Sequence, residues 1–276
     1  MQPTVEHAIA RMLVAYQDNR WFIDEHWPVN APHVRRMVSD LVRRLPGLRD
    51  ARVLDVGCFN GYLGCLLTHL GCRVTGADAC LPPESERIFE RAGMEFLEVN
   101  LNCQEPFREL ASESFDAIII AQVIEHVLNH PLGLLRALSR VLRPGGVLIL
   151  TTPNPSTLMN AVRVLRGTYS LWGTRAFIDE PKLNGREVIA KADIHYREYS
   201  QDELRHMLEG ADLHIEEARY LGLGTARSEG RLRTVVKALP LFGRLSSTRL
   251  LGSNHYMVGR RPSPADQPGF LRRAPI

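Results

Sequence analysis

The stretch VLDVGCFNGYLG (residues 53–64) joins a short apolar run to a carboxylate and a glycine-rich turn. The run ends at Asp55, and glycines follow at Gly57, Gly61 and Gly64. Glycine lets a backbone turn sharply and approach a ligand closely, and a helix that follows presents unpaired N–H groups at its first turn. The stretch therefore predicts a buried strand, a ligand-binding turn and a helix.

Similar strand segments recur along the chain, namely CRVTGAD, MEFLEV, FDAIIIA, GVLILTTP, LHIEEARYL and NHYMVGRR. FDAIIIA is continuously apolar, as a strand covered on both faces must be. Leucines at helical spacing lie between several of these segments, as in residues 63–70 and 132–142. This alternation predicts an α/β fold with a doubly wound, mostly parallel seven-stranded sheet.

The domain organisation follows from the remaining periodicity. Apolar residues recur at helical spacing in residues 5–16 and 34–45, which predicts a helical N-terminal cap over residues 1–50. The main domain is expected over residues 51–261, with an insertion after the fifth strand at about residues 155–195. An insertion of that length is usually functional, and this one is expected to close over the site. Residues 262–276 are rich in proline and are expected to be a disordered tail.

Composition excludes several classes of protein. Of the 276 residues, 45% are hydrophobic and 24% are charged, as in an ordinary globular protein. The five cysteines form no Cys-x-x-Cys pair, which argues against zinc knuckles and a disulfide framework. The N-terminus has no signal-peptide pattern, and no segment has the roughly 20 apolar residues of a transmembrane helix. We therefore expect a soluble, cytoplasmic protein.

Positive charge is concentrated at the C-terminal end. From residue 218 onward there are eleven Arg or Lys and two acidic residues, although the whole chain carries only +3. This asymmetry suggests peripheral contact of residues 219–261 with an anionic membrane or with RNA. A solvated basic surface, or a helix packed on the sheet with its arginines reaching out to water, is the alternative.

The glycine-rich turn lacks the features of common nucleotide sites. Phe59 stands where the dinucleotide motif G-x-G-x-x-G needs its second glycine, and no Gly-Lys-Ser/Thr sequence of a P-loop is present. No tyrosine has the Tyr-x-x-x-Lys pattern of short-chain dehydrogenases. Asp55 ends one strand, and Asp78 ends the next about 20 residues on, where a carboxylate can bind ribose hydroxyls. Two carboxylates suit a cationic nucleoside without phosphate, such as S-adenosylmethionine (SAM).

The order of VLDVGCFNGYLG, GADA, NLNCQEPF, SFDAIIIAQVIEHV and LSRVLRPGGVLILTTPNP resembles that of the class I SAM-dependent methyltransferases. The sequence is most similar to the group that includes ubiquinone-biosynthesis and glycan O-methyltransferases. The resemblance implies a Rossmann-like methyltransferase fold with SAM as cofactor. It also implies a set of SAM-binding residues: Asp55 and Gly57 at the methionine end, Gly61 where the loop turns under it, Asp78 at the ribose, Asn100 and Leu101 beside the adenine, and Gln122 and Val123 on the methionine side after the fourth strand.

An oxygen acceptor must lose a proton during methyl transfer, and a general base speeds that step by about 10²–10⁴-fold. The candidate bases are Glu125, His126 and His130 in VIEHVLNH and His195 in DIHYREYS. Histidine titrates near neutral pH and suits the role. His195 is the preferred candidate because it follows the insertion, His126 and Glu125 come next, and His130 precedes Pro131 and is expected to start a helix.

Three functions remain open from the sequence. The first is O-methylation of a small-molecule, glycan or lipid-linked acceptor. The second rests on the resemblance of QVIEHV to the E-x-x-E-H motif of small-RNA 3′-terminal 2′-O-methyltransferases, which implies a divalent metal on Glu125, His126 and His195, with Gln122 in place of the first glutamate. The third is a catalytically inactive SAM-binding partner protein. We expect the first, without a metal.

Overall fold

The computed structural model of the chain describes residues 4–128, 130–168, 194–222 and 248–264. Its centre is a seven-stranded sheet with the order β3-β2-β1-β4-β5-β7-β6. Neighbouring strands from β3 to β5 are parallel, and β7 runs antiparallel to both β5 and β6. The strands are β1 (Arg52–Val56), β2 (Arg73–Asp78), β3 (Glu95–Glu98), β4 (Phe115–Ala121), β5 (Leu142–Pro153), β6 (His214–Leu221) and β7 (Asn254–Arg260). The predicted doubly wound, mostly parallel seven-stranded sheet is confirmed.

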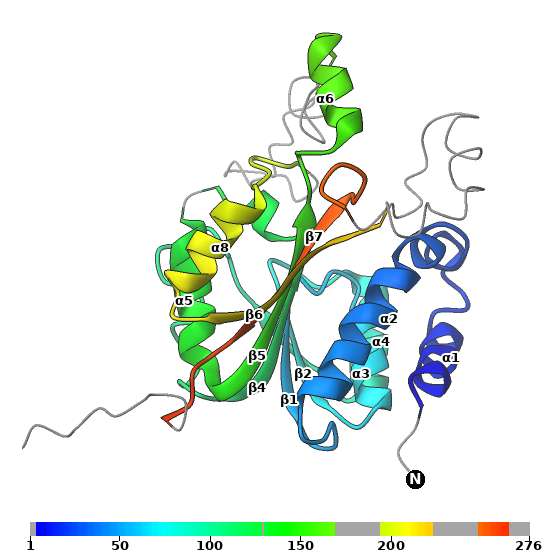
Figure 1. The fold of residues 1–276 in the computed structure, drawn as a ribbon. Helices are drawn as coiled ribbons and strands as arrows, with labels where there is room; N and C mark the ends of the chain where they lie inside the picture. Colours follow the sequence, from blue (N-terminus) through cyan, green and yellow to red (C-terminus); the bar gives the residue numbers. More distant parts are fainter. Residues whose placement is uncertain (1–3, 129, 169–193, 223–247, 265–276) are drawn as a thin grey trace, which may run out of the picture.

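Helices cover both faces of the sheet (Figure 1). On one face lie α1 (Val5–Ala15), α2 (Trp27–Arg44), α3 (Tyr62–His69) and α4 (Pro83–Ala92), and on the other lie α5 (Pro131–Val141) and α8 (Gln201–Glu209). Ser200 and Glu203 form a capping box at the start of α8. The short helix α6 (Leu158–Leu165) follows β5 and projects away from the body of the molecule.

Two elements differ from the sequence expectation. Helix α2 begins at Trp27, directly after a π-helix over Phe22–His26, whereas the apolar periodicity begins only at Val34. Pro28 lies in the first turn, where proline is tolerated, and Pro32 lies inside the helix, where proline removes an N–H donor. Both mask the helical pattern in the sequence. Strand β5 begins at Leu142 and therefore includes residues 142–145, ahead of the predicted strand segment GVLILTTP. The insertion begins with α6, and its residues 169–193 lie outside the described residues.

The core explains why FDAIIIA is continuously apolar. Ala117 and Ile119 of β4 pack in the cluster that contains α1, α2 and α3, while Ile118 and Ile120 pack in the cluster that contains α5 and α8. All four residues have no exposed surface. Because successive strand residues point to opposite faces, a strand covered on both sides needs apolar residues at every position.

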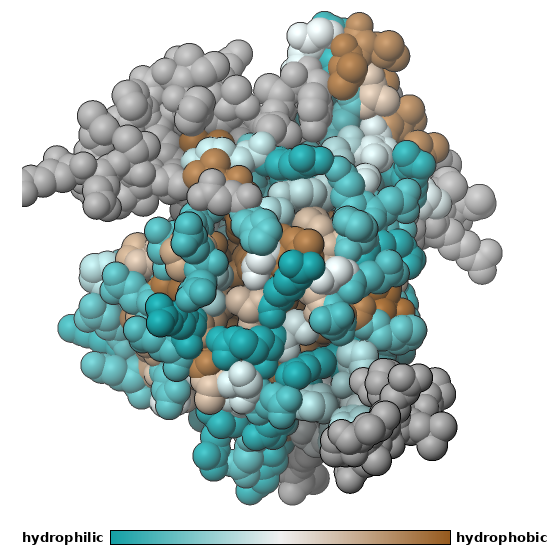
Figure 2. Space-filling model, turned by 90° about the vertical axis from the view of Figure 1, so that its left-hand side faces the viewer, coloured by the Kyte–Doolittle hydropathy of each residue, from teal (hydrophilic) through white to brown (hydrophobic). Residues whose placement is uncertain are grey.

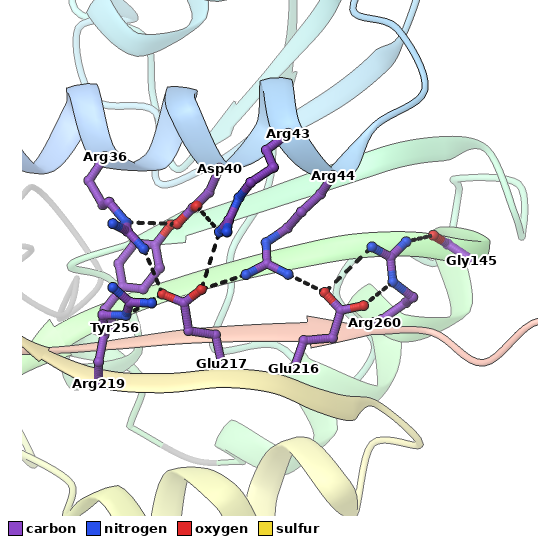
Figure 3. A network of polar contacts seen from close by, with 10 residues as sticks. All are labelled: Arg36, Asp40, Arg43, Arg44, Gly145, Glu216, Glu217, Arg219, Tyr256 and Arg260. Carbon is purple, nitrogen blue, oxygen red and sulfur yellow. Dashed lines mark hydrogen bonds and ion pairs between the residues drawn. The ribbon is translucent and has the colours of Figure 1, made fainter.

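A network of ion pairs holds α2 against the antiparallel edge of the sheet (Figure 3). Asp40 is 2% exposed, and its carboxylate accepts hydrogen bonds from Arg36 Nε at 2.9 Å and from the Tyr256 hydroxyl of β7 at 2.7 Å. Arg36 also donates to Glu217 of β6 at 2.9 Å. The remaining members are Arg43, Arg44, Glu216, Arg219 and Arg260. These contacts join α2 to strands more than 170 residues away along the chain.

We predict that Asp40→Asn lowers the free energy of unfolding by about 1.5–3 kcal/mol at pH 7, because it removes the charge that the buried donors need. Burial alone raises the pKa of Asp40, but the bonds from Tyr256 and Arg36 hold it below its usual value. Its stabilisation is therefore present above about pH 4 and is lost as the pH falls further. Urea unfolding at pH 7 and pH 3 measures this, and the difference between variant and wild type should shrink at pH 3.

The control for this prediction is Asp50→Asn. Asp50 pairs with Arg73 at 3.2 Å, but both side chains are largely exposed. We expect a change below about 1 kcal/mol. An equal loss of stability in both variants would contradict the assigned role of Asp40.

Candidate active site

The turn after β1 is shaped by two glycines with positive φ. Gly57 has φ +69°, and a Cβ placed on it would lie 2.2 Å from Cγ2 of Val123, which follows β4. Gly61 has φ +81°, and a Cβ there would lie 2.3 Å from the ring of Phe89 in α4. Both glycines are therefore required by the protein's own packing, in addition to any close approach of a ligand.

Asp55 lies at the end of β1 and is 3% exposed. Its Oδ2 atom has no hydrogen-bond partner among the described residues. Burial, with a smaller contribution from the charge of Asp78, raises the pKa of Asp55 to about 7, and the backbone of Gly64 partly opposes this. A buried carboxyl group with an unsatisfied oxygen is a site where a cationic or hydrogen-bond-donating ligand would be stabilised.

Asp78 ties the end of β2 to the glycine turn. Its carboxylate accepts one hydrogen bond from the backbone N–H of Phe59 at 2.8 Å and another from that of Ala79 at 2.7 Å. Phe59 has φ +51° and a half-exposed side chain. Its ring contacts those of Trp21 and His26, with centroid distances of 6.0 and 5.9 Å. The residue that replaces a glycine therefore meets the N-terminal helices.

The ends of β3 and β4 complete this part of the site. After β3, Asn100 Oδ1 accepts the backbone N–H of Asn102 at 2.9 Å, and Leu101 packs partly buried against the core. After β4, Gln122 has φ +58° and donates from Nε2 to Thr151 Oγ1 at 3.2 Å. Val123 is buried against Gly57. The eight residues that the sequence singled out for SAM thus lie at or just after the carboxyl ends of four neighbouring parallel strands.

Glu125 begins the second part of the site and has no exposed surface. Its Oε2 accepts a hydrogen bond from Thr152 Oγ1 of β5 at 2.9 Å, while Oε1 has no partner in the described part of the chain. Burial raises the pKa of Glu125 to about 7, and the bond from Thr152 and the nearby His195 oppose this in part. Its backbone carbonyl accepts the N–H of Tyr196 at 2.8 Å.

His126 and His195 meet at this point although 68 residues separate them. The His126 Nδ1 lies 2.7 Å from the Ile194 carbonyl oxygen, and the two imidazole rings pack edge to face with centroids 5.0 Å apart. The His195 Nδ1 lies 2.9 Å from Glu198 Oε1. One donor atom from each of Glu125, His126 and His195 lies within 4.8 Å of the others, a spacing that could hold a metal ion.

The sequence analysis missed two residues of this cluster, Glu198 and Thr152. Glu198 follows His195 by three residues, and Thr152 lies in the buried end of β5. The only signal for Glu198 is the polar pattern of DIHYREYS, and nothing in GVLILTTP marks Thr152 as the partner of Glu125. His130 lies just before α5, and its ring faces Gly133, in agreement with the expected helix start.

Solved structures share this architecture. The chain matches a Burkholderia thailandensis 1,6-didemethyltoxoflavin-N1-methyltransferase, solved with its acceptor and S-adenosylhomocysteine, with a TM-score of 0.53, 18% identity and coverage of 92% of this chain and 87% of the other. It also matches the putative methyltransferase solved with the Haloferax volcanii Trm112 activator, with a TM-score of 0.54, 16% identity and coverage of 92% and 97%. The fold is therefore that of the Rossmann-like class I methyltransferases.

The sequence comparisons are more specific. A family model described as a methyltransferase domain matches residues 31–218. A ubiquinone biosynthesis O-methyltransferase of Xanthomonas oryzae pv. oryzae is 31% identical over 229 residues, which cover 80% of this chain and 87% of the relative. The chain belongs to this methyltransferase family, and it is a SAM-dependent methyltransferase.

No helix in the described part of the chain is long and apolar enough to cross a membrane.

We predict that Gly57→Ala lowers the free energy of unfolding by about 2–4 kcal/mol, because it adds both left-handed backbone strain and a clash with Val123. Gly57→Ala combined with Val123→Ala should recover part of the loss relative to the sum of the two single changes, since only the clash is removed. Urea unfolding of the four proteins measures the coupling. Strictly additive losses would contradict a direct contact between the two positions.

Proposed function

We propose that the enzyme methylates a hydroxyl group on a small-molecule, glycan or lipid-linked acceptor. The observation that carries this proposal is that His195 and Glu198, which precede α8, lie beside His126, which follows β4. An oxygen acceptor needs a base, and an imidazole oriented by a carboxylate is a suitable one. The O-methyltransferase named among the relatives supports the same reaction class.

The proposed cofactor site uses the residues at the carboxyl ends of β1 to β4. Asp55 and Asp78 would hold the methionine end and the ribose, with Gly57 and Gly61 in the turn below. Asn100 and Leu101 would flank the adenine, and Gln122 and Val123 would line the methionine side. The unsatisfied Oδ2 of buried Asp55 fits a cationic ligand. When bound, SAM supplies a methyl group already activated on a sulfonium.

His195 is proposed as the catalytic base. With Glu198 accepting from Nδ1–H, the basic lone pair of His195 is on Nε2. The carboxylate then stabilises the imidazolium that forms when the acceptor proton is taken. His126 packs against the His195 ring. The backbone carbonyl of Glu125 accepts the Tyr196 N–H and so holds the segment that contains His195. We propose these two as the remaining members of the catalytic group.

A second candidate function rests on the same residues. The three ligand atoms within 4.8 Å of one another would suit a divalent ion, and the unpartnered Oε1 of Glu125 would then coordinate that ion. That arrangement would match a metal-assisted RNA 3′-terminal 2′-O-methyltransferase. Gln122 stands where a further acidic ligand would be needed, and its amide donates to Thr151 instead. We therefore place the metal-free reaction first.

Peripheral contact of residues 219–261 with an anionic membrane or RNA remains part of the proposal, as does a cytoplasmic location. Residues 223–247 lie outside the described residues. Of the described arginines, Arg219 pairs with Glu217 and Arg260 pairs with Glu216. Arg261 pairs with Glu113, so part of the positive charge of this range is neutralised within the protein.

We predict that SAM affinity rises about tenfold between pH 6 and pH 7.5. Asp55, with a pKa of about 7, becomes ionised over this range, and a cationic ligand favours its ionised form. Binding at pH 6 should therefore release a proton, and Asp55→Asn should bind more weakly with little dependence on pH. Calorimetry in two buffers of different ionisation enthalpy measures both effects. If the Asp55→Asn protein keeps the pH dependence of SAM binding, that dependence arises from another ionisable group.

The reaction itself is tested with methyl-labelled SAM and three sets of acceptors: small hydroxyl compounds, a lipid extract, and RNA with a free 3′ end. We expect label on a hydroxyl of the first or second set, at a rate that a chelator leaves unchanged. Label on RNA that disappears with chelator would establish the metal-assisted alternative. SAM binding without transfer to any acceptor would indicate the inactive partner protein.

The base is tested in the same assay. His195→Gln should lower the rate about 10²–10⁴-fold while SAM affinity and melting temperature stay nearly unchanged. The matched control is His214→Gln, since His214 is exposed at the start of β6, at the opposite end of the sheet from the site. A well-folded His195→Gln protein with full activity would remove His195 from the mechanism.

A further inference from the structure

Two large aromatic side chains are half exposed at the glycine turn. Phe59 and Trp21 are 46% and 47% exposed, and their rings meet edge to face with centroids 6.0 Å apart. Figure 2 shows the side of the molecule with α5 and α8, where apolar residues lie in small groups among hydrophilic ones. Single exposed apolar residues need no explanation, but two aromatic rings in contact beside a candidate ligand site indicate an interaction surface.

The pair belongs to a larger aromatic group. The ring centroid of His26 lies 4.8 Å from that of Trp21, 5.9 Å from that of Phe59 and 5.3 Å from that of Tyr62. We call Trp21, His26, Phe59 and Tyr62 the aromatic wall. Burial lowers the pKa of His26, so its ring is uncharged at neutral pH. The aromatic wall therefore presents four rings and no positive charge.

The aromatic wall adjoins both carboxylates of the proposed cofactor site. Phe59 lies in the glycine turn itself, and its backbone N–H donates to Asp78 Oδ2 at 2.8 Å. Tyr62 begins α3 directly after the turn. Burial, and then the charge of Asp55, raise the pKa of Tyr62, so Asp55 lies near enough for its charge to act on this ring. A ligand held by Asp55 and Asp78 would therefore lie beside the wall.

Phe59 has a backbone conformation that favours glycine. Its φ is +51°, in the left-handed region, where a residue with a Cβ is strained. Glycine at this position would avoid both the strain and the exposure of a large apolar ring. A strained residue of this kind beside a ligand site indicates that its side chain has a role in the site.

Aromatic rings and a buried carboxyl group together favour a cationic ligand. The face of an aromatic ring carries negative potential and attracts a cation within about 6 Å of the ring centroid. Asp55 adds a buried carboxyl group whose Oδ2 has no partner among the residues that the structure describes. SAM carries two cations at its methionine end, the ammonium and the sulfonium. The chemistry of the wall therefore matches that end of the proposed cofactor.

We propose that the rings of Phe59 and Trp21 bind the cationic methionine end of SAM and so set how strongly the site prefers SAM to neutral adenosine compounds. This inference rests on the proposed cofactor site and adds two side chains to it. Trp21 belongs to the N-terminal cap, so the cap contributes to ligand binding as well as to the core. Removal of either ring lowers the affinity only for ligands that carry the cation.

The test is calorimetric binding of three ligands to the full chain: SAM, S-adenosylhomocysteine and 5′-methylthioadenosine, which has the same adenosine but no amino-acid part. Phe59→Leu keeps an apolar side chain without the ring, and it should lower SAM affinity about three- to thirtyfold, as should Trp21→Leu. Neither change should alter the affinity for 5′-methylthioadenosine. Phe59→Tyr keeps the ring and should bind SAM like the wild type.

S-adenosylhomocysteine identifies which cation the rings bind, because it keeps the ammonium and lacks the sulfonium. Equal loss for SAM and S-adenosylhomocysteine would assign the ammonium, and loss for SAM alone would assign the sulfonium.

The matched control is Tyr220→Leu, which removes an aromatic ring that contacts His255 at the edge strand β6. This variant should bind all three ligands like the wild type. Melting temperatures establish that each variant is folded. Trp21 lies on a different segment from the strained turn, so Trp21→Leu tests the wall even where Phe59→Leu disturbs the turn.

Unchanged SAM affinity in the folded Phe59→Leu and Trp21→Leu proteins would overturn the proposal. An equal loss of affinity for 5′-methylthioadenosine would also overturn it, because the changes would then have damaged the turn as a whole. A wild-type protein that binds none of the three ligands would contradict the proposed cofactor site, and the role of the wall with it. Binding by the wild type that the variants retain would contradict the wall alone, so the two failures are distinguishable.

Discussion

The parallel pairing of β1 between β2 and β4 is the constraint on which the site depends. Asp55 pairs with Gly76 on one side and with Ile119 on the other, so the three strands end at the same edge. Register alone therefore brings Asp55, Asp78 and Gln122 together. A slip of one residue would turn the side chains of β1 to the opposite face and remove Asp55 from the turn.

The two carboxyl groups of the site are held in an unfavourable environment. Asp55 and Glu125 are both buried, each has an oxygen with no partner among the described residues, and burial raises the pKa of each to about 7. Buried polar groups of this kind cost stability unless a ligand satisfies them. Asp40 differs from them, because two arginines and Tyr256 satisfy its carboxylate oxygens. The unmet interactions at Asp55 and Glu125 are therefore available to the ligands proposed above.

The N-terminal helices contact the glycine turn as well as the core. Tyr16 of the segment after α1 donates its hydroxyl hydrogen to the Asn60 carbonyl oxygen in the glycine turn at 2.6 Å. Trp21 and His26 contact Phe59 in the same turn. The network on α2 anchors these helices to the far edge of the sheet. The bulky residue in the turn is thus accommodated by the helices that cover it.

The sequence by itself determined the strands, most helices and the family, because continuous apolar runs, glycine turns and ordered motifs are local features that one stretch of chain can show. It also singled out Asp55, Asp78, Glu125, His126 and His195. Only the tertiary structure decided which of these meet. The pairing of His195 with Glu198, the bond from Thr152 to Glu125 and the contact between Trp21 and Phe59 join residues whose significance depends on their neighbours in space. Periodicity records which face of an element is buried, but it carries no information on what lies opposite that face.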